Sequence, residues 1–194
     1  MKKTNSLFQF SLLFIQPIFM TSNIAIARGA FENIPPVALA CSRWLLVFLV
    51  FFPFIYKSIL KKKKYFKEEF WRLTFLGATG YAGCGALPYI SGLTTTVTNM
   101  SIIYALSPIF IVLLSAYYYK ERLHLFQYFG VFLSLFGVSF IIFKGNLSNF
   151  VNLNFSIGDV WILGAAISWS FFSIFLINWK SKFDILERFT LMSL

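Results

Sequence analysis

The polar side chain with the most specific chemistry in this 194-residue chain is Arg43, which lies inside a long apolar stretch. Arginine presents its N–H donors as a planar fork that matches a carboxylate or a phosphate. Arg43 follows Pro36, the start of the stretch, by about 10 Å along a helix. At that depth in a membrane an arginine normally faces protein or water, and the alternative is that it snorkels to the interface. We expect Arg43 to attract an anionic or zwitterionic small molecule.

Other polar residues recur at helical spacing and reach the same depth. Gln9, Gln16 and Asn23 are seven residues apart and share one helix face. Tyrosines share a face of the third apolar stretch, and a face with threonine, tyrosine and proline runs along the fourth. The alternatives are a bond to the residue's own helix for threonine and an interfacial aromatic belt for tyrosine. The predicted substrate-binding residues are Asn23, Arg43, Tyr81, Tyr89, Thr98, Tyr104 and Pro108.

Residues for enzyme or metal chemistry are scarce. The chain has one histidine, His124, so an H-E-x-x-H zinc site is excluded. Neither a G-x-S-x-G turn nor a phosphate-binding P-loop occurs. The carboxylates are predicted to lie in loops or at membrane boundaries, which leaves no pair for acid–base catalysis in the apolar stretches. We therefore expect no enzyme, no metal site and no cofactor. The carboxylates are Glu32, Glu68, Glu69, Glu121, Asp159, Asp184 and Glu187.

The composition places these residues in a membrane protein. Hydrophobic residues make up 58% of the chain and charged residues 12%, with a mean hydropathy of +0.74. Soluble domains carry about 25% charged residues, and a soluble chain of this composition would expose large apolar patches. The net charge of +10 comes from basic residues between the apolar stretches. The positive-inside rule explains it without a nucleic-acid partner, so the lipid bilayer is the expected partner.

Seven apolar stretches organise the chain, and the first six are long enough to cross the hydrocarbon core as helices. The predicted fold class is therefore all-α, a polytopic helical membrane protein. On the third stretch Ala78, Ala82 and Ala86 recur every four residues, which predicts a small-residue face for close helix packing. The stretches cover residues 7–27, 36–56, 70–90, 96–119, 125–143 and 157–178, and the last begins at Phe189.

The basic residues indicate the orientation of these stretches. Of the 17 Lys and Arg residues, 14 fall on alternate gaps and therefore on one side, whereas Arg28 and Lys144 fall on the other. Basic loops stay in the cytoplasm, so we expect a cytoplasmic N-terminus, a cytoplasmic loop at 57–69 and a cell inner (plasma) membrane location. One alternative for residues 1–27 stays open: a cleavable secretory signal ending at Ala25-Ile26-Ala27.

Several short motifs follow one another from the third to the fifth apolar stretch: Tyr89-Ile90-Ser91-Gly92, Pro108, Glu121-Arg122-Leu123, Gln127, Gly130 and Gly137-Val138. In the order and spacing of these motifs, the chain resembles the EamA family of the drug/metabolite transporter superfamily. Upstream, the residues that fit are Asn23, Pro35-Pro36 and Arg43. Downstream, Gly158-Asp159 and Ala165-Ala166-Ile167-Ser168-Trp169 resemble the start of the family's second repeat.

The resemblance implies a ten-helix secondary transporter with two inverted five-helix repeats, a central cavity and alternating access. Residues 1–143 would form the first repeat, and residues 157–194 the start of the second. Arg43 would attract the charged group of the substrate, Asn23 and Tyr81 would orient it, and Pro108 would loosen the fourth span. Because the last stretch stops after six residues, at Leu194, we expect a fragment of a longer transporter.

The expected function is transport of small metabolites or drugs across the inner membrane. A truncated or assembly-only membrane protein without transport activity is the alternative. A homodimer stays open, as do the identity of the substrate, the direction of transport and the coupling ion. Uptake into proteoliposomes separates the two functional hypotheses, because only a transporter accumulates a labelled molecule above the level of empty vesicles.

Overall fold

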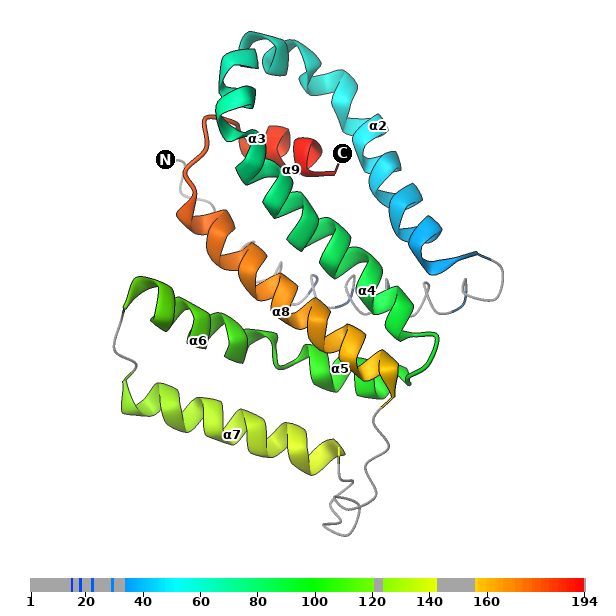
Figure 1. Ribbon diagram of the computed structural model, residues 1–194, viewed down its shortest axis with the longest axis vertical. Coiled ribbons are helices and arrows are strands. Elements are labelled where there is room, and N and C mark those ends of the chain that lie inside the picture. Colours follow the sequence, from blue (N-terminus) through cyan, green and yellow to red (C-terminus); the bar gives the residue numbers. More distant parts are fainter. Residues whose placement is uncertain are drawn as a thin grey trace.

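The computed structural model describes residues 34–120, 124–142 and 156–193, together with residues 15, 18, 22 and 29. The regular elements of this part are helices (Figure 1). Most of the first predicted stretch, Asn23 included, lies outside the described residues, as does the motif at 121–123. In chain order the elements are α2 (Pro36–Lys61), α3 (Lys63–Gly77), the π-helical η1 (Ala78–Gly83), α4 (Cys84–Ser91), α5 (Val97–Tyr104), α6 (Ser107–Tyr119), α7 (Leu125–Ile142), α8 (Ile157–Asn178) and α9 (Ile185–Met192).

Within the described part, three helical segments are long and apolar enough to cross a membrane by length and composition. They are Pro36–Lys61, Val97–Tyr119 and Ile157–Asn178. Large apolar side chains cover outward faces, and Phe126 on α7 is 89% exposed. Such exposure is unfavourable in water, whereas lipid covers these side chains in a bilayer. The prediction of an all-α, polytopic helical membrane protein is confirmed.

The third predicted stretch forms one continuous helical run from α3 through η1 to α4. The backbone stays right-handed helical at both junctions, Ala78 and Cys84. In η1 the Cys84 N–H bonds to the Thr79 carbonyl five residues earlier, which is the wider π-helical pattern. Pro88 in α4 lacks a backbone donor. Backbone carbonyls of this run are therefore available to neighbouring helices.

The loop predicted at 57–69 is mostly helical instead. Helix α2 continues to Lys61 and α3 begins at Lys63, so the helical geometry is interrupted at Lys62, with φ −98° and ψ 15°. Lysine and glutamate have high helix propensity. The helices therefore extend past the apolar stretches that were used to bound them.

Helix α8 is the central helix of the described part and packs against α4, α5 and α6. In Figure 1 it runs beside α4 on one side and α5 and α6 on the other. Ala165 and Ala166 on α8 are 0% exposed. The Ser170 hydroxyl donates to the Ser107 carbonyl at 3.3 Å and so joins α8 to the start of α6. Small residues on α8 thus permit close packing on two sides.

Glycines, rather than the predicted alanines, bring the third stretch close to α8. Ala78 and Ala82 are exposed, whereas Ala86 packs against Ala40 and Tyr89, so the predicted alanine face is wrong at its first two positions. A Cβ at Gly80 would lie 2.4 Å from the ring of Phe172 on α8, and one at Gly83 would also overlap α8. The spacing of small residues therefore located the correct helix but the wrong face of it, because the facing side chains leave no room for a methyl group.

The start of α8 is tied to the turn between α4 and α5. Ser156 and Asp159 form a capping box, in which the Asp159 carboxylate accepts the Ser156 N–H at 2.9 Å. The other carboxylate oxygen accepts the Thr95 hydroxyl at 2.6 Å. Thr95 and Asp159 are both buried. Because buried polar groups need hydrogen-bond partners, this bond fixes the two segments to one another.

We expect Thr95→Val to lower the free energy of unfolding by about 1–3 kcal/mol, because Asp159 loses a donor at a buried oxygen. The measurement is the thermal midpoint of the purified protein in detergent, followed by circular dichroism. Thr74→Val is the matched control, since Thr74 is exposed on α3. Equal midpoints for the Thr95 variant and the unaltered chain would mean that this bond adds no net stability.

Helix α9 begins with a capping box and lies against α2 and α3 (Figure 1). Glu187 in its first turn is 3% exposed. Its carboxylate accepts Lys62 Nζ at 2.6 Å, the Asp184 N–H at 2.8 Å and the Ser58 hydroxyl. One carboxylate therefore joins the start of α9 to the end of α2.

The prediction that Glu68, Glu69 and Glu187 belong to loops is wrong, because all three lie in helices. Glu69 is a buried residue of α3, and its carboxylate accepts the Ser181 hydroxyl at 2.5 Å and the Lys182 N–H at 2.9 Å. The Glu69 and Glu187 carboxylates hold the segment after α8 onto the first helices. Hydrogen bonds and, for Glu187, an ion pair offset the desolvation cost of burying these carboxylates. Most of these partners are distant in the sequence, so local sequence does not reveal them.

These contacts make the attachment of α9 sensitive to acid. Burial alone raises the pKa of Glu187, but hydrogen bonds from Lys62, Ser58 and the Asp184 N–H outweigh it and lower the pKa below 4.5. A lowered carboxyl pKa contributes stability that is lost as the pH falls through the folded-state value. The hydrogen bond to Glu187 raises the pKa of Lys62, so its contribution is lost only as the pH rises above 10.5.

We therefore expect Glu187→Gln to lower the thermal midpoint at pH 7, with a difference from the unaltered chain that shrinks as the pH falls below 4.5. Thermal unfolding in detergent across this pH range measures it. Glu68→Gln serves as the control, because Glu68 is exposed on α3. A difference that stays constant down to about pH 3 would contradict the linkage.

Candidate functional site

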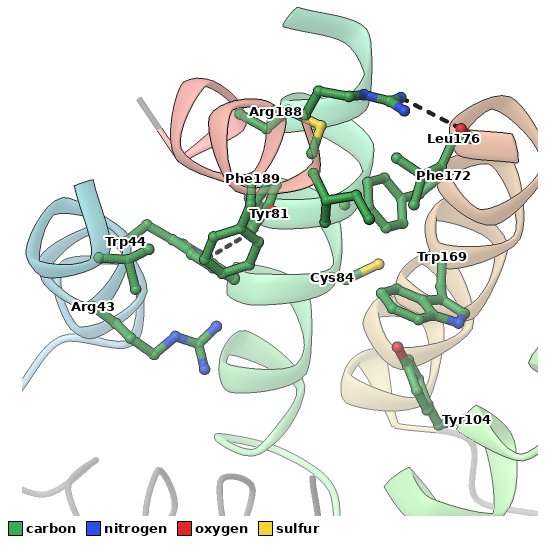
Figure 2. Close-up of a pocket in the computed structure, with 14 residues that line it drawn as sticks. Arg43, Trp44, Tyr81, Cys84, Tyr104, Trp169, Phe172, Leu176, Arg188 and Phe189 are labelled. Atoms are coloured by element: carbon green, nitrogen blue, oxygen red, sulfur yellow. Dashed lines mark hydrogen bonds between the residues drawn. The ribbon is translucent and has the colours of Figure 1, made fainter. Parts of the chain in front are cut away.

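A cavity of about 670 Å³ lies between α2 and the third helical run on one side and α8 and α9 on the other. Figure 2 shows side chains from these helices around it. Pockets for drug-sized molecules span about 300–1,000 Å³, so the cavity is large enough for a small metabolite. Its lining residues are Arg43, Trp44, Val47, Gly80, Tyr81, Cys84, Tyr104, Trp169, Phe172, Leu176, Ile185, Arg188, Phe189 and Met192.

Arg43 extends from α2 into one end of the cavity (Figure 2). Its Nη1 donates to the Tyr89 hydroxyl at 2.5 Å. The guanidinium also lies 4.8 Å from the ring centroid of Trp44 and 5.3 Å from that of Tyr89. A cation over an aromatic face is stabilised by about 0.5–2 kcal/mol. Two rings and one hydroxyl thus hold the guanidinium in a defined direction inside the protein.

The π-helical turn positions Trp44 beside Arg43. Trp44 Nε1 donates to the Tyr81 backbone carbonyl at 3.1 Å. Gly85 permits this approach, because a Cβ there would lie 2.6 Å from Trp44 Nε1 and 3.4 Å from Arg43 Nη2. A π-helical turn occurs often at functional sites. Here it sets the distance between α2 and the third helical run.

Aromatic rings form much of the cavity wall. The Tyr81 ring lies edge-on to Trp44, with centroids 4.0 Å apart. It also contacts Phe189 at 5.8 Å and Phe172 at 6.1 Å. Trp169 lies 5.3 Å from Phe172 on α8. Edge-to-face packing fixes the Tyr81 ring relative to its neighbours, and the Trp169 and Phe172 rings are tilted by 36° to one another. The wall is therefore both apolar and well defined in shape.

The charged side chains among the described lining residues are two arginines, without a carboxylate. Arg188 lies on α9, at the opposite end of the cavity from Arg43 in Figure 2. Its Nη2 donates to the Leu176 carbonyl at 3.4 Å, a long bond. No group of three or more His, Cys, Asp or Glu residues that would suit a metal ion occurs in the described part. The arrangement is suited to binding and orienting a ligand.

Among known protein families, one matches most of this chain. A model of the EamA-like transporter family matches residues 7–143, which is more than half of the chain. The chain belongs to this family. No curated protein and no solved structure matches it. As an EamA-like transporter it is a multi-pass membrane protein with a small-molecule substrate and a lipid surrounding.

Of the predicted binding residues of this EamA-like transporter, the structure brings three to the cavity: Arg43, Tyr81 and Tyr104. Tyr89 is buried in α4 and contacts the cavity through Arg43, whose guanidinium it holds. The tyrosine is therefore a positioning residue in this structure. Its hydroxyl accepts the hydrogen bond from Arg43 within the protein.

The other predicted residues are not brought to the cavity. Thr98 is exposed on α5. Residues 105–106 divide the fourth span into α5 and α6, and Pro108 lies in the first turn of α6. Proline is favoured at such a position because its missing N–H has no helical partner there. Asn23 lies outside the described residues.

Sequence reasoning missed several lining residues of the transporter cavity. Trp44, Trp169 and Phe172 were not predicted as site residues, because an aromatic residue in an apolar stretch faces lipid as readily as protein. Arg188 was counted among the basic loop residues. A usable signal for it existed: Asp184 followed three residues later by Glu187 is a capping-box pattern that predicts a helix start.

Proposed function

We propose that this EamA-like transporter carries small organic anions or zwitterions across the inner membrane by alternating access, with the cavity as its substrate site. The observation that carries the proposal is an arginine held by Tyr89 and Trp44 at the end of an aromatic-walled cavity of about 670 Å³. A fixed guanidinium in a site of low dielectric attracts a carboxylate or phosphate strongly.

The repeat organisation supports this choice of site. Residues 1–143 are the proposed first repeat, and residues 157–194 the start of the second. In that division α2, η1 and α4 belong to the first repeat and α8 and α9 to the second, so the cavity lies at their junction. Substrate sites of inverted-repeat transporters lie at such junctions.

Alternating access would require two contacts between the proposed repeats to break and re-form. The Thr95–Asp159 bond joins the two repeats at one end of α8, and the Lys62–Glu187 pair joins them at the other. A rocking motion that opens one end needs the contact at that end to break while the other persists. In this proposal the Thr95–Asp159 bond keeps one end of the cavity closed, and the Lys62–Glu187 pair keeps the other end closed.

Uptake into proteoliposomes tests the proposed function. The protein is reconstituted, and uptake of radiolabelled carboxylates, phosphates and amino acids is compared with uptake by empty vesicles. Saturable uptake that competes with an unlabelled substrate supports transport. No uptake above the empty vesicles for any of these classes would instead favour the second candidate, a truncated or assembly-only membrane protein.

The proposed orientation, with a cytoplasmic N-terminus, predicts which positions an external reagent reaches. In a background lacking Cys41 and Cys84, we expect an impermeant maleimide to label Leu93→Cys on intact cells. We expect it to label Lys64→Cys only after permeabilisation. Both positions are exposed, so accessibility within the protein does not decide the result. Labelling of Lys64→Cys on intact cells would contradict the proposed orientation and place the N-terminus outside the cell.

A further inference from the structure

The charges around the cavity are unbalanced. Arg188 has no carboxylate partner within the described part of the chain, where the ion pairs both involve Lys62. Its Nε is buried and finds no hydrogen-bond acceptor among the described residues, and the bond from its Nη2 to the Leu176 carbonyl is long, at 3.4 Å. Buried charges are normally paired. The Arg188 guanidinium on α9 therefore lacks both a carboxylate and a full set of hydrogen-bond acceptors among the described residues.

The described helices that line the cavity contain few carboxylates. No Asp or Glu occurs from residue 33 to residue 67 or from residue 70 to residue 120. None occurs from residue 1 to residue 31 either, so the first apolar stretch adds none. In α8 the one carboxylate, Asp159, is at the capping end and bonded to Thr95. Among the described lining residues, the ammonium of a zwitterion would meet two arginines and no carboxylate.

The remaining lining is aromatic and apolar. Trp44, Tyr81 and Phe189 contact one another on one side, and Trp169 packs with Phe172 on the other. Ring faces and edges bind flat aromatic bodies with geometric preference beyond the area they bury. An aliphatic body of equal volume makes the same hydrophobic contact without these ring–ring geometries.

From these observations, and resting on the proposed function, we infer that the transporter selects aromatic organic anions that carry no amino group. The aromatic body lies among the rings of Trp44, Tyr81 and Trp169, and a guanidinium holds the anionic group. Arg188 is a specificity-determining residue of this site. Amines are excluded by repulsion, and amino acids because their ammonium loses its hydration without gaining a carboxylate partner.

Four ligands built on the same fused two-ring carbon skeleton test the inference on the unaltered full chain in lipid nanodiscs. They are 2-naphthoate, naphthalen-2-ylmethylamine, 3-(2-naphthyl)alanine and decahydro-2-naphthoate, titrated by calorimetry at neutral pH with empty nanodiscs as the control. We expect 2-naphthoate to bind at least about tenfold more tightly than each of the other three. Equal or tighter binding of the amine or the amino acid, or no binding of 2-naphthoate, would overturn the inference.

Variants then test the role of Arg188. Arg188→Gln should weaken binding of 2-naphthoate about tenfold or more, and Arg188→Lys should retain part of it because the charge persists without the planar fork. Arg72→Gln, an exposed arginine of α3, should bind like the unaltered chain. Unchanged affinity in a folded Arg188→Gln protein would remove Arg188 from the site. The four-ligand comparison decides the substrate class even where a variant fails to fold.

The two levels of proposal fail in different ways. Saturable proteoliposome uptake of an amino acid, with no preference for 2-naphthoate, leaves transport standing and overturns the aromatic-anion class. Tight 2-naphthoate binding without uptake supports the class and the site but contradicts transport by this chain. Binding and uptake are therefore measured on the same preparation.

Discussion

Arg43→Ala is expected to lower saturable uptake by proteoliposomes about tenfold to a hundredfold while the yield of folded protein stays similar. A hydrogen bond to a charged group contributes about 1.5–3 kcal/mol, and each 1.4 kcal/mol is about a factor of ten in affinity. The guanidinium is already oriented by Tyr89 and Trp44. Its removal therefore loses a preorganised charge that no other residue of α2 replaces.

Matched variants separate substrate binding from packing. Arg43→Lys should restore uptake only in part, because lysine is a point charge without a planar fork. Tyr89→Phe should reduce uptake less than Arg43→Ala, since the charge stays but its hydrogen bond is lost. Arg72→Ala removes an exposed arginine and should leave uptake unchanged. Full uptake by a folded Arg43→Ala protein would mean that Arg43 has no contact with substrate.

The spans could be predicted from sequence because their signal is local. Apolar length and the placement of basic residues depend on nearby residues alone, and the sixth stretch coincides with α8, Ile157–Asn178. The ends of helices were less predictable. Lys61 and Lys63 belong to helices, since helix propensity continues where hydropathy stops.

The residue types of the site could be predicted from sequence, but not which helix face points into the cavity. Arg43 was identified because a charge in an apolar stretch is conspicuous, and Tyr104 because its helical spacing matched that of other polar residues. Thr98 follows the same spacing, yet it is exposed. The face of α5 that meets the cavity is determined by α8, which follows it by more than fifty residues in the sequence. Local periodicity holds no information about that partner.

Arg188 shows a second kind of limit. Its neighbours Lys180 and Lys182 are loop residues, and counting charges placed all three together. The buried Glu187 brings α9 against α2, and this places Arg188 at the cavity. The contact is tertiary, since Lys62 and Glu187 are 125 residues apart. Only the capping-box pattern pointed to a helix here, and it does not indicate where that helix packs.

Gly80→Ala is expected to destabilise the protein by about 2–3 kcal/mol, at the upper end of the usual effect of overpacking. A Cβ at this position would lie 2.4, 2.6 and 2.8 Å from three atoms of the Phe172 ring. Phe172 is 8% exposed and packed in one cluster with Leu76 and Tyr81, so turning its ring aside would disturb these contacts. The strain would separate η1 from α8 and distort the aromatic wall of the cavity.

Gly164→Ala on α8 is the matched control for Gly80→Ala, because it adds the same methyl group to a helix of the same membrane region. There the nearest atom to an added Cβ is Leu87 Cδ1 at 3.5 Å, an ordinary contact. Alanine is favoured over glycine within a helix by about 0.5–1 kcal/mol, so Gly164→Ala should hold or raise the thermal midpoint in detergent. The two substitutions are thus expected to shift the midpoint in different directions. A Gly80→Ala midpoint equal to that of Gly164→Ala would show that η1 and α8 are not in close contact at Phe172, and the cavity wall built on that contact would have to be revised.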